Sequence, residues 1–154
     1  MISTSYLSDV YEPKKFTKAV STVVRDIKAL RKRKAFDSIA FTGQSGSAFA
    51  YAVAARTGIP LTCVRKKGSS SHFAGKRGGV EGKIPKKYII IDDFIETGAT
   101  ISNITTAVDV ECIDVHRREA KCVAIYLYSP IYGGSKYDKD FNGIPIIRRK
   151  RARS

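Results

Sequence analysis

The stretch IIIDDFIETGATI, residues 89–101, contains the pattern that decides the fold. It begins with three consecutive isoleucines, which are typical of a strand buried on both faces. Two adjacent carboxylates, Asp92 and Asp93, follow where this strand should end. A turn of small and hydroxyl-bearing residues comes next, and a helical segment is expected after it. A strand, a polar turn and a helix in this order predict a parallel sheet with a ligand site at the strand ends.

The turn after the carboxylates has the composition of a phosphate-binding loop. Thr97, Gly98, Ala99 and Thr100 are small, so the backbone can approach a ligand closely and surround a phosphate with N–H groups. The start of the following helix adds a partial positive charge. Carboxylate oxygens suit a sugar diol or a Mg²⁺ ion. The stretch therefore indicates a ribose phosphate site, although an acidic strand end before a capped helix would use the same residues.

The rest of the chain alternates between helical and strand-like periodicity. Helices are expected at residues 13–34, 47–57 and 100–115. Strands are expected at residues 38–42, 60–64, 88–91, 121–128 and 144–147. The periodicity vanishes in a Gly- and Ser-rich stretch over residues 68–82, which is typical of disorder or of a functional loop. This order predicts one α/β domain over residues 1–147.

The bulk composition agrees with a globular domain that carries excess positive charge. Of 154 residues, 43% are hydrophobic and 27% charged, and the formal net charge of +14 attracts phosphorylated ligands and polyanions. No apolar run approaches the ~20 residues that cross a bilayer, and the start has no secretory pattern, so a cytoplasmic protein without a membrane partner is expected. The three cysteines, Cys63, Cys112 and Cys122, are expected to be buried free thiols.

The last residues, RRKRARS at 148–154, are expected to form a disordered basic tail. A solvated chain end is one interpretation of this segment. A nonspecific contact with nucleic acid is the other, because a run of cations attracts phosphates.

The segment YIIIDDFIETGAT, residues 88–100, resembles the signature of the type I phosphoribosyltransferases. That signature has an apolar strand, two acidic residues, two apolar residues and a small turn with Thr-Gly. Phe94 is larger than usual at its place, and Glu96 replaces the small residue of many members. AFTGQSGSAF, residues 40–49, resembles the family's pyrophosphate loop, and PLTCVRKKG, residues 60–68, resembles its basic turn. The resemblance covers roughly residues 36–108.

The resemblance implies a parallel β-sheet flanked by helices, with a small irregular hood and a flexible loop that closes over the site. It implies transfer of a phosphoribosyl group from 5-phosphoribosyl 1-pyrophosphate (PRPP) to a nucleobase, with Mg²⁺ as cofactor and release of pyrophosphate. Members often form dimers, so a homodimer is an expectation. A PRPP- or nucleotide-binding regulator with little or no turnover, which would bind nucleic acid through its basic surface, stays open as the alternative.

The resemblance also assigns roles to residues of three loops. Asp92 and Asp93 would bind the ribose hydroxyls, directly or through Mg²⁺. The 5-phosphate would lie against Glu96, Thr97, Gly98, Ala99 and Thr100. The pyrophosphate would lie against Gly43, Gln44, Ser45, Gly46 and Ser47, and against Arg65, Lys66 and Lys67. The charges of Arg65 and Lys66 would stabilise the departing pyrophosphate.

Glu96 is the residue that indicates the acceptor. Members that act on 6-oxopurines have an acid at this place, beside purine N7, where a carboxylate can exchange a proton with the base. Adenine members usually have a small residue there, and orotate members a hydroxyl or a small one. A 6-oxopurine is therefore expected, with adenine and orotate as alternatives, and Phe141 and Ile95 are the expected base contacts. A favourable acid in the first turn of a helix is the other reading of Glu96.

Overall fold

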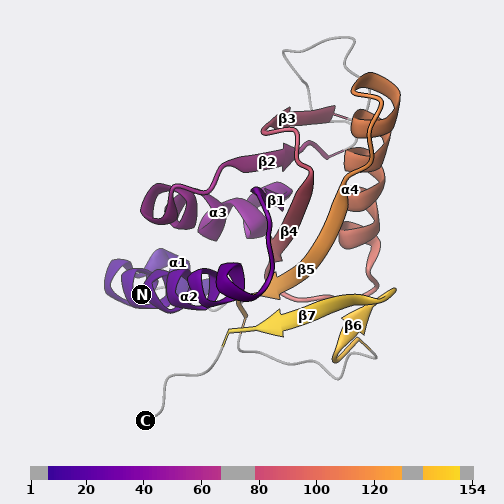
Figure 1. Cartoon of the computed structure of the whole chain (residues 1–154). Helices are drawn as coiled ribbons and strands as arrows, with labels where there is room; N and C mark the ends of the chain where they lie inside the picture. The colour runs from indigo at the N-terminus through magenta and orange to yellow at the C-terminus, as the bar shows by residue number, and fades with distance from the viewer. Residues whose placement is uncertain (1–6, 67–78, 130–136, 150–154) are drawn as a thin grey trace.

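The computed structural model describes residues 7–66, 79–129 and 137–149, which form a sheet with helices on both faces (Figure 1). Seven strands lie in the order β3-β2-β1-β4-β5-β7-β6. Their bounds are β1 Ser38–Phe41, β2 Leu61–Val64, β3 Val80–Gly82, β4 Lys87–Asp92, β5 Lys121–Leu127, β6 Asp140–Phe141 and β7 Ile144–Arg148. Only β3 and β6 run antiparallel to their neighbours among these described strands. The expected parallel sheet flanked by helices is confirmed.

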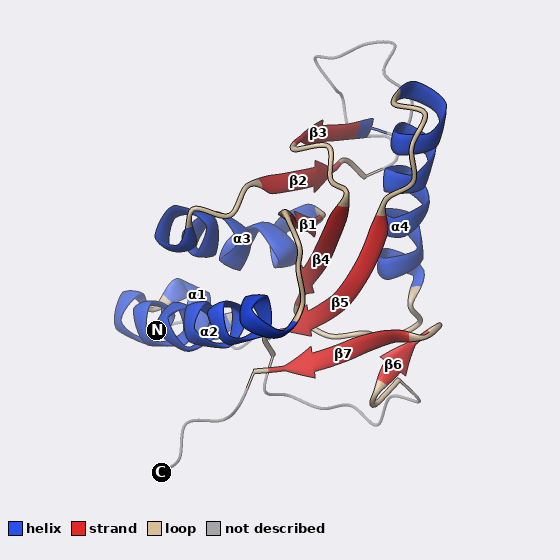
Figure 2. Cartoon of the chain, viewed as in Figure 1, coloured by secondary structure: helices blue, strands red, loops and turns tan. Residues whose placement is uncertain are grey.

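The helices divide between the two faces of the sheet (Figure 2). Their bounds are α1 Ser8–Tyr11, α2 Pro13–Arg33, α3 Gly43–Thr57 and α4 Ala99–Val110. Successive residues of a strand point to opposite faces, so β4 contributes to two cores. Ile89 and Ile91 pack with α2 and α3, whereas Tyr88 and Ile90 pack with α4. The buried run of β4 is therefore explained by helices on both sides.

Two helix boundaries differ from those expected. The helix α3 begins at Gly43 rather than at Ser47, because the glycine adopts a φ of 63° and the chain turns directly from β1 into the helix. The helix α4 ends at Val110, and a π-helical turn over Glu111–Val115 continues it. The β-branched residues of this segment weaken regular helix, which fits the change.

The C-terminal segment is more regular than the expected irregular hood. The sequence DFNGIP forms a hairpin of β6 and β7, with Asn142 (φ 49°) and Gly143 (φ 82°) in the two-residue turn. Asn-Gly favours this turn because both residues tolerate positive φ. Strand β3 also lies within the stretch expected to lack structure. Residues 67–78 and 130–136 lie outside the described residues.

Arg148 and Arg149, which were expected to belong to the disordered tail, are part of the described fold. Arg148 belongs to β7, and the Arg149 N–H donates to the carbonyl of Leu127 at 2.9 Å. The Arg149 guanidinium also lies 3.7 Å from the Asp9 carboxylate. Backbone pairing and this ion pair hold both arginines at the edge of the sheet, and residues 150–154 lie outside the described part of the chain. Within the described residues, no helix combines the length and apolar character that a bilayer span requires.

The cysteines lead to a prediction on thiol reactivity. Burial raises the pKa of Cys122 to about 12, and burial also raises the pKa of Cys63 and of Cys112. A raised pKa leaves little thiolate at neutral pH, and the thiolate is the reactive form. At pH 8 we expect alkylation of Cys122 to be at least about 100-fold slower in the folded protein than in denaturant. Mass spectrometry of the modified peptide measures the rate, and equal rates in the two conditions would contradict the raised pKa of this half-buried thiol.

Candidate functional site

The three segments expected to form the site meet at one edge of the sheet. β1 pairs in parallel with β2 on one side and with β4 on the other. The segments that follow these strands therefore leave the same edge, and the Thr42 hydroxyl, which donates to the carbonyl of Val64 at 2.6 Å, ties two of them together. The starts of α3 and α4 both lie at this edge. Their first N–H groups have no partners within the helix and carry partial positive charge.

Asp92 and Asp93 lie between these two helix starts, at the end of β4. Both are buried, with exposed fractions of 4% and 7%. The Ser45 hydroxyl donates to Asp92 Oδ1 at 3.2 Å, and the Phe94 N–H donates to Asp93 Oδ1 at 2.7 Å. Burial, and then the charge of Asp93, raises the pKa of Asp92 to about 7. A cation or a hydroxyl-bearing ligand would relieve this unfavourable accumulation of negative charge.

The donor set of the two aspartates fits a magnesium ion. Mg²⁺ prefers oxygen ligands, and proteins commonly bind it through one or two carboxylates together with water and substrate phosphates. Two neighbouring buried carboxylates, of which Asp92 lines a cavity with the turn at residues 96–100, match this arrangement. Asp92 and Asp93 are therefore the residues that would bind the ion.

The turn from Glu96 to Thr100 has the form of an anion cradle. Gly98 precedes α4 with a φ of 87°, which only glycine adopts readily, and the Ala99 N–H donates to Thr97 Oγ1 at 3.2 Å. The turn lines a small cavity of about 40 Å³ together with Asp92. Glu96 is exposed at this cavity, so its carboxylate is accessible to a ligand.

Gly98 also allows a close contact that the sequence does not reveal. A Cβ on Gly98 would lie 2.2 Å from Cε2 of Phe141, which comes from β6. Phe141 is 5% exposed, and its ring packs against Tyr137 with 4.9 Å between ring centroids. The C-terminal hairpin thus packs directly against the turn at residues 96–100.

This packing corrects the expected base contacts. Phe141 and Ile95, 6% exposed, belong to the core cluster between the sheet and α4. The sequence analysis expected both to contact a base, and their burial does not support that contact. Both side chains are large and apolar, and the core accounts for them.

The segment from Gly43 to Ser47, expected as a loop, is the first turn of α3. Gly43, Gln44, Ser45 and Gly46 therefore present helix N-terminal N–H groups, which suit an anion as well as a loop would. Gly46 permits close packing, since a Cβ there would lie 2.9 Å from Cβ of Phe41. The Ser47 hydroxyl donates to the carbonyl of Gln44 at 3.2 Å, within the same turn.

Tyr128 is a residue of the site that the sequence analysis missed. Its hydroxyl donates to the carbonyl of Ser45, and its ring packs against Phe49 at a centroid distance of 4.0 Å. The contact joins the end of β5 to the first turn of α3. A tyrosine that directly follows a buried strand, at the edge where ligands bind, was the only available signal.

The basic turn after β2 divides its side chains between two directions. Arg65 forms a bidentate pair with Glu81 of β3, with distances of 3.0 and 3.2 Å. Lys66 covers Gly43, since a Cβ there would lie 2.7 Å from Lys66 Cε. Lys66 thus lies at the start of α3 as expected, whereas Arg65 is engaged with a carboxylate. Lys67 lies outside the described residues.

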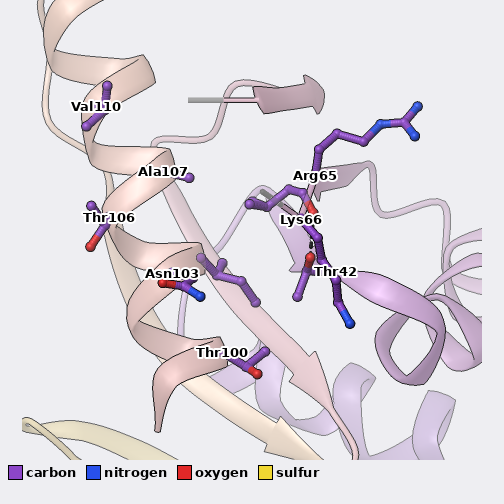
Figure 3. Close-up of a pocket in the computed structure, with 10 residues that line it drawn as sticks. Thr42, Arg65, Lys66, Thr100, Asn103, Thr106, Ala107 and Val110 are labelled. Carbon is purple, nitrogen blue, oxygen red and sulfur yellow. Dashed lines mark hydrogen bonds between the residues drawn. The ribbon is translucent and has the colours of Figure 1, made fainter. Parts of the chain in front are cut away.

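A second, larger cavity adjoins the turn at residues 96–100 through Thr100 (Figure 3). It has a volume of about 500 Å³ and lies between α4 and the ends of β1 and β2. Its lining combines polar and apolar side chains: Thr42, Val64, Arg65, Lys66, Thr100, Asn103, Ile104, Thr106, Ala107 and Val110. In Figure 3 the Arg65 side chain extends away from α4.

Solved structures with a similar fold include adenine and orotate phosphoribosyltransferases and a UMP synthase. The match to adenine phosphoribosyltransferase from Thermoanaerobacter pseudethanolicus covers 92% of this chain and 83% of that enzyme, with 21% identity and a TM-score of 0.56. The match to orotate phosphoribosyltransferase from Aeropyrum pernix covers 81% of this chain and 64% of that enzyme, with 16% identity and a TM-score of 0.59. For UMP synthase from Leishmania donovani the values are 80% and 24%, with 21% identity and a TM-score of 0.53.

These similarities define the fold as that of the type I phosphoribosyltransferases, as the sequence resemblance implied. The chain spans about a quarter of the UMP synthase and just under two thirds of the Aeropyrum enzyme. No protein-family model matches the sequence, and no curated protein matches it.

Proposed function

We propose that the protein transfers a phosphoribosyl group from PRPP to a nucleobase. The observation that supports this function most strongly is that the buried Asp92 adjoins two helix N-termini: it accepts a hydrogen bond from Ser45 in the first turn of α3, and it lines a cavity with the turn that begins α4. Two phosphate groups and a sugar diol are the parts of PRPP that such a site would bind. The similar structures, which are orotate and adenine phosphoribosyltransferases, support the same reaction class.

In the proposed reaction, the bond between the anomeric carbon and pyrophosphate breaks as a base nitrogen bonds to that carbon. The α4 turn would bind the 5-phosphate, and the first turn of α3, with Lys66, would bind the pyrophosphate. A bound Mg²⁺ would supply positive charge that neutralises the pyrophosphate oxygens. Asp92 and Asp93 would hold the ribose, directly or through the ion, so that the anomeric carbon faces the base.

The test is pyrophosphate release from PRPP with Mg²⁺ and a panel of bases: guanine, hypoxanthine, xanthine, adenine, orotate, uracil and nicotinamide. We expect turnover with at least one of them and with a 6-oxopurine in preference. Preference for adenine or orotate would keep the reaction class and reject the purine assignment. Binding of PRPP without turnover of any base would reject the enzyme and favour the regulator.

Glu96 is the residue on which the 6-oxopurine proposal depends. Its carboxylate is exposed at the cradle, where it could exchange a proton with the base. We expect Glu96→Ala to lower kcat with the preferred purine by about 100-fold, which is typical of a lost acid–base group. PRPP affinity, measured by titration calorimetry, should change less than about threefold.

Glu96→Gln is the matched variant, because it keeps the size of the side chain and removes proton exchange. It should lose as much turnover as Glu96→Ala. Equal losses in kcat and PRPP affinity would instead reduce Glu96 to a helix-end acid.

A further inference from the structure

The outer face of α2 carries a straight row of basic side chains. Lys14, Lys18, Arg25, Lys28 and Lys32 are all exposed. At about 100° per residue they fall within a sector of about 80°, and they extend over about 27 Å of helix. The buried residues of α2 lie on the opposite side of the helix: Ala19, Val20, Val23, Val24, Ile27 and Leu30. This basic row therefore points directly away from the core, and Figure 1 shows α2 at the outside of the molecule beside α3.

A neighbouring helix fills the one gap in the row. Ser21 lies on the same face between Lys18 and Arg25, and the Arg56 guanidinium of α3 donates to its hydroxyl at 3.0 Å. Arg56 is itself exposed. With Arg56, a cation occurs every three or four residues, which is about 4.5 to 6 Å along the helix axis.

The row is almost free of compensating negative charge. Within residues 7–66, 79–129 and 137–149, no carboxylate forms an ion pair with Lys14, Lys18, Lys28 or Lys32. Asp26 lies 3.7 Å from Arg25, but it is turned inward and accepts a hydrogen bond from the Tyr126 hydroxyl at 2.7 Å. A helix exposed only to solvent usually alternates the signs of its charges, and this one does not.

We propose that the basic row of α2, with Arg56, binds the phosphate backbone of a nucleic-acid duplex without sequence preference. A rigid row of closely spaced cations matches a linear polyanion, and binding releases the counterions condensed on it. A membrane surface fits less well, because none of the exposed large apolar side chains in the described residues lies on α2. Single strands also fit less well, because they are usually bound through exposed aromatic residues, and the exposed aromatic residues of the described chain, Tyr11, Tyr51 and Phe94, lie outside α2. This surface is separate from the PRPP site.

The test measures binding of the full chain to a fluorescent 20-base-pair DNA duplex, and to an RNA duplex of equal length, by anisotropy over a salt series. One triple variant removes charge from the row: Lys18→Gln, Lys28→Gln and Lys32→Gln. The matched control removes the same charge from exposed lysines elsewhere: Lys83→Gln, Lys121→Gln and Lys139→Gln. Circular dichroism and PRPP binding, which neither variant should change, verify that both proteins are folded.

We expect the row variant to lose at least about tenfold in duplex affinity at moderate salt, and the control to lose less than about threefold. For the row variant, a plot of the logarithm of the duplex association constant against the logarithm of the salt concentration should become shallower by about 2.7 in slope. This change corresponds to three lost phosphate contacts at about 0.9 each. Equal losses in both variants would overturn the proposal, because net charge alone would then explain binding. The proposal would also fail if the wild-type protein did not bind the duplex, or if removal of residues 150–154 abolished binding. It would fail as well if the row variant lost affinity for phosphatidylserine vesicles but kept its affinity for the duplex.

Discussion

Replacement of both Asp92 and Asp93 by Asn is expected to weaken PRPP binding in the presence of Mg²⁺ by about 100-fold or more. The two carboxylates are buried at the end of β4 between the starts of α3 and α4. Asn keeps the size of each side chain but removes the charge that would attract the metal ion or the ribose hydroxyls. Titration calorimetry with PRPP and Mg²⁺ measures the loss.

The matched control replaces two exposed acids far from the site: Asp109→Asn, near the C-terminal end of α4, and Asp114→Asn, in the π-helical turn that follows it. This control should bind PRPP as the wild-type protein does. Equal affinity of the wild-type protein and the Asp92 and Asp93 variant would contradict the site assignment.

The variant with Asp92→Asn and Asp93→Asn should be more stable to heat than the wild-type protein at pH 8 without Mg²⁺. The pKa of Asp92 is raised in the folded state, so its ionised form opposes folding, and stability is lost as pH rises from about 4 toward 7. Asn removes that cost. Lower stability of the variant would instead identify the carboxylates as structural groups, and a thermal melt distinguishes the two outcomes.

Gly98→Ala is expected to lower the free energy of unfolding by about 2 kcal/mol or more. Alanine at a φ of 87° is strained, and its Cβ would lie 2.2 Å from the ring of Phe141, which is held in the core. For a chain of this size the change corresponds to a fall in Tm of about 6 °C. Displacement of the turn should also weaken PRPP binding by about tenfold.

Gly58→Ala is the control for backbone strain alone. Gly58 has a similar φ of 73°, but a Cβ there would have no neighbour within 4 Å. The additional loss in Gly98→Ala therefore measures the contact with Phe141, and Phe141→Leu in the Gly98→Ala background should restore part of it. Equal losses in the two alanine variants would show that the ring does not constrain the turn.

The sequence predicted the parallel architecture well, and it also predicted that the candidate site segments would meet at one edge of the sheet, because both depend on local patterns. The run from Ile89 to Ile91 predicts a strand covered on both faces, and the acidic turn after it predicts the edge where ligands bind. Strand β3 and the start of α3 were misjudged because their residues have weak propensities. A glycine at positive φ begins α3, which periodicity does not detect.

The contacts that shape the site were beyond prediction because they join distant residues. The Phe141 ring reaches Gly98, and the Tyr128 hydroxyl reaches the carbonyl of Ser45, through tertiary packing. From the sequence, Phe141 was expected to contact a base, and Tyr128 looks like an ordinary core residue at the end of a strand. The Asn-Gly turn that brings Phe141 into place was, by contrast, a readable local signal.

The support of Gly98 by Phe141 has a consequence for synthesis of the protein. The turn at residues 96–100 follows β4 in the middle of the chain, but the ring that packs against it is supplied by β6, and β7 pairs with β5. Because chains emerge from the ribosome N-terminus first, the turn lacks this backing until residues 140–148 have been translated. A nascent chain halted before that point would carry the whole acidic motif and still have an unfinished cradle.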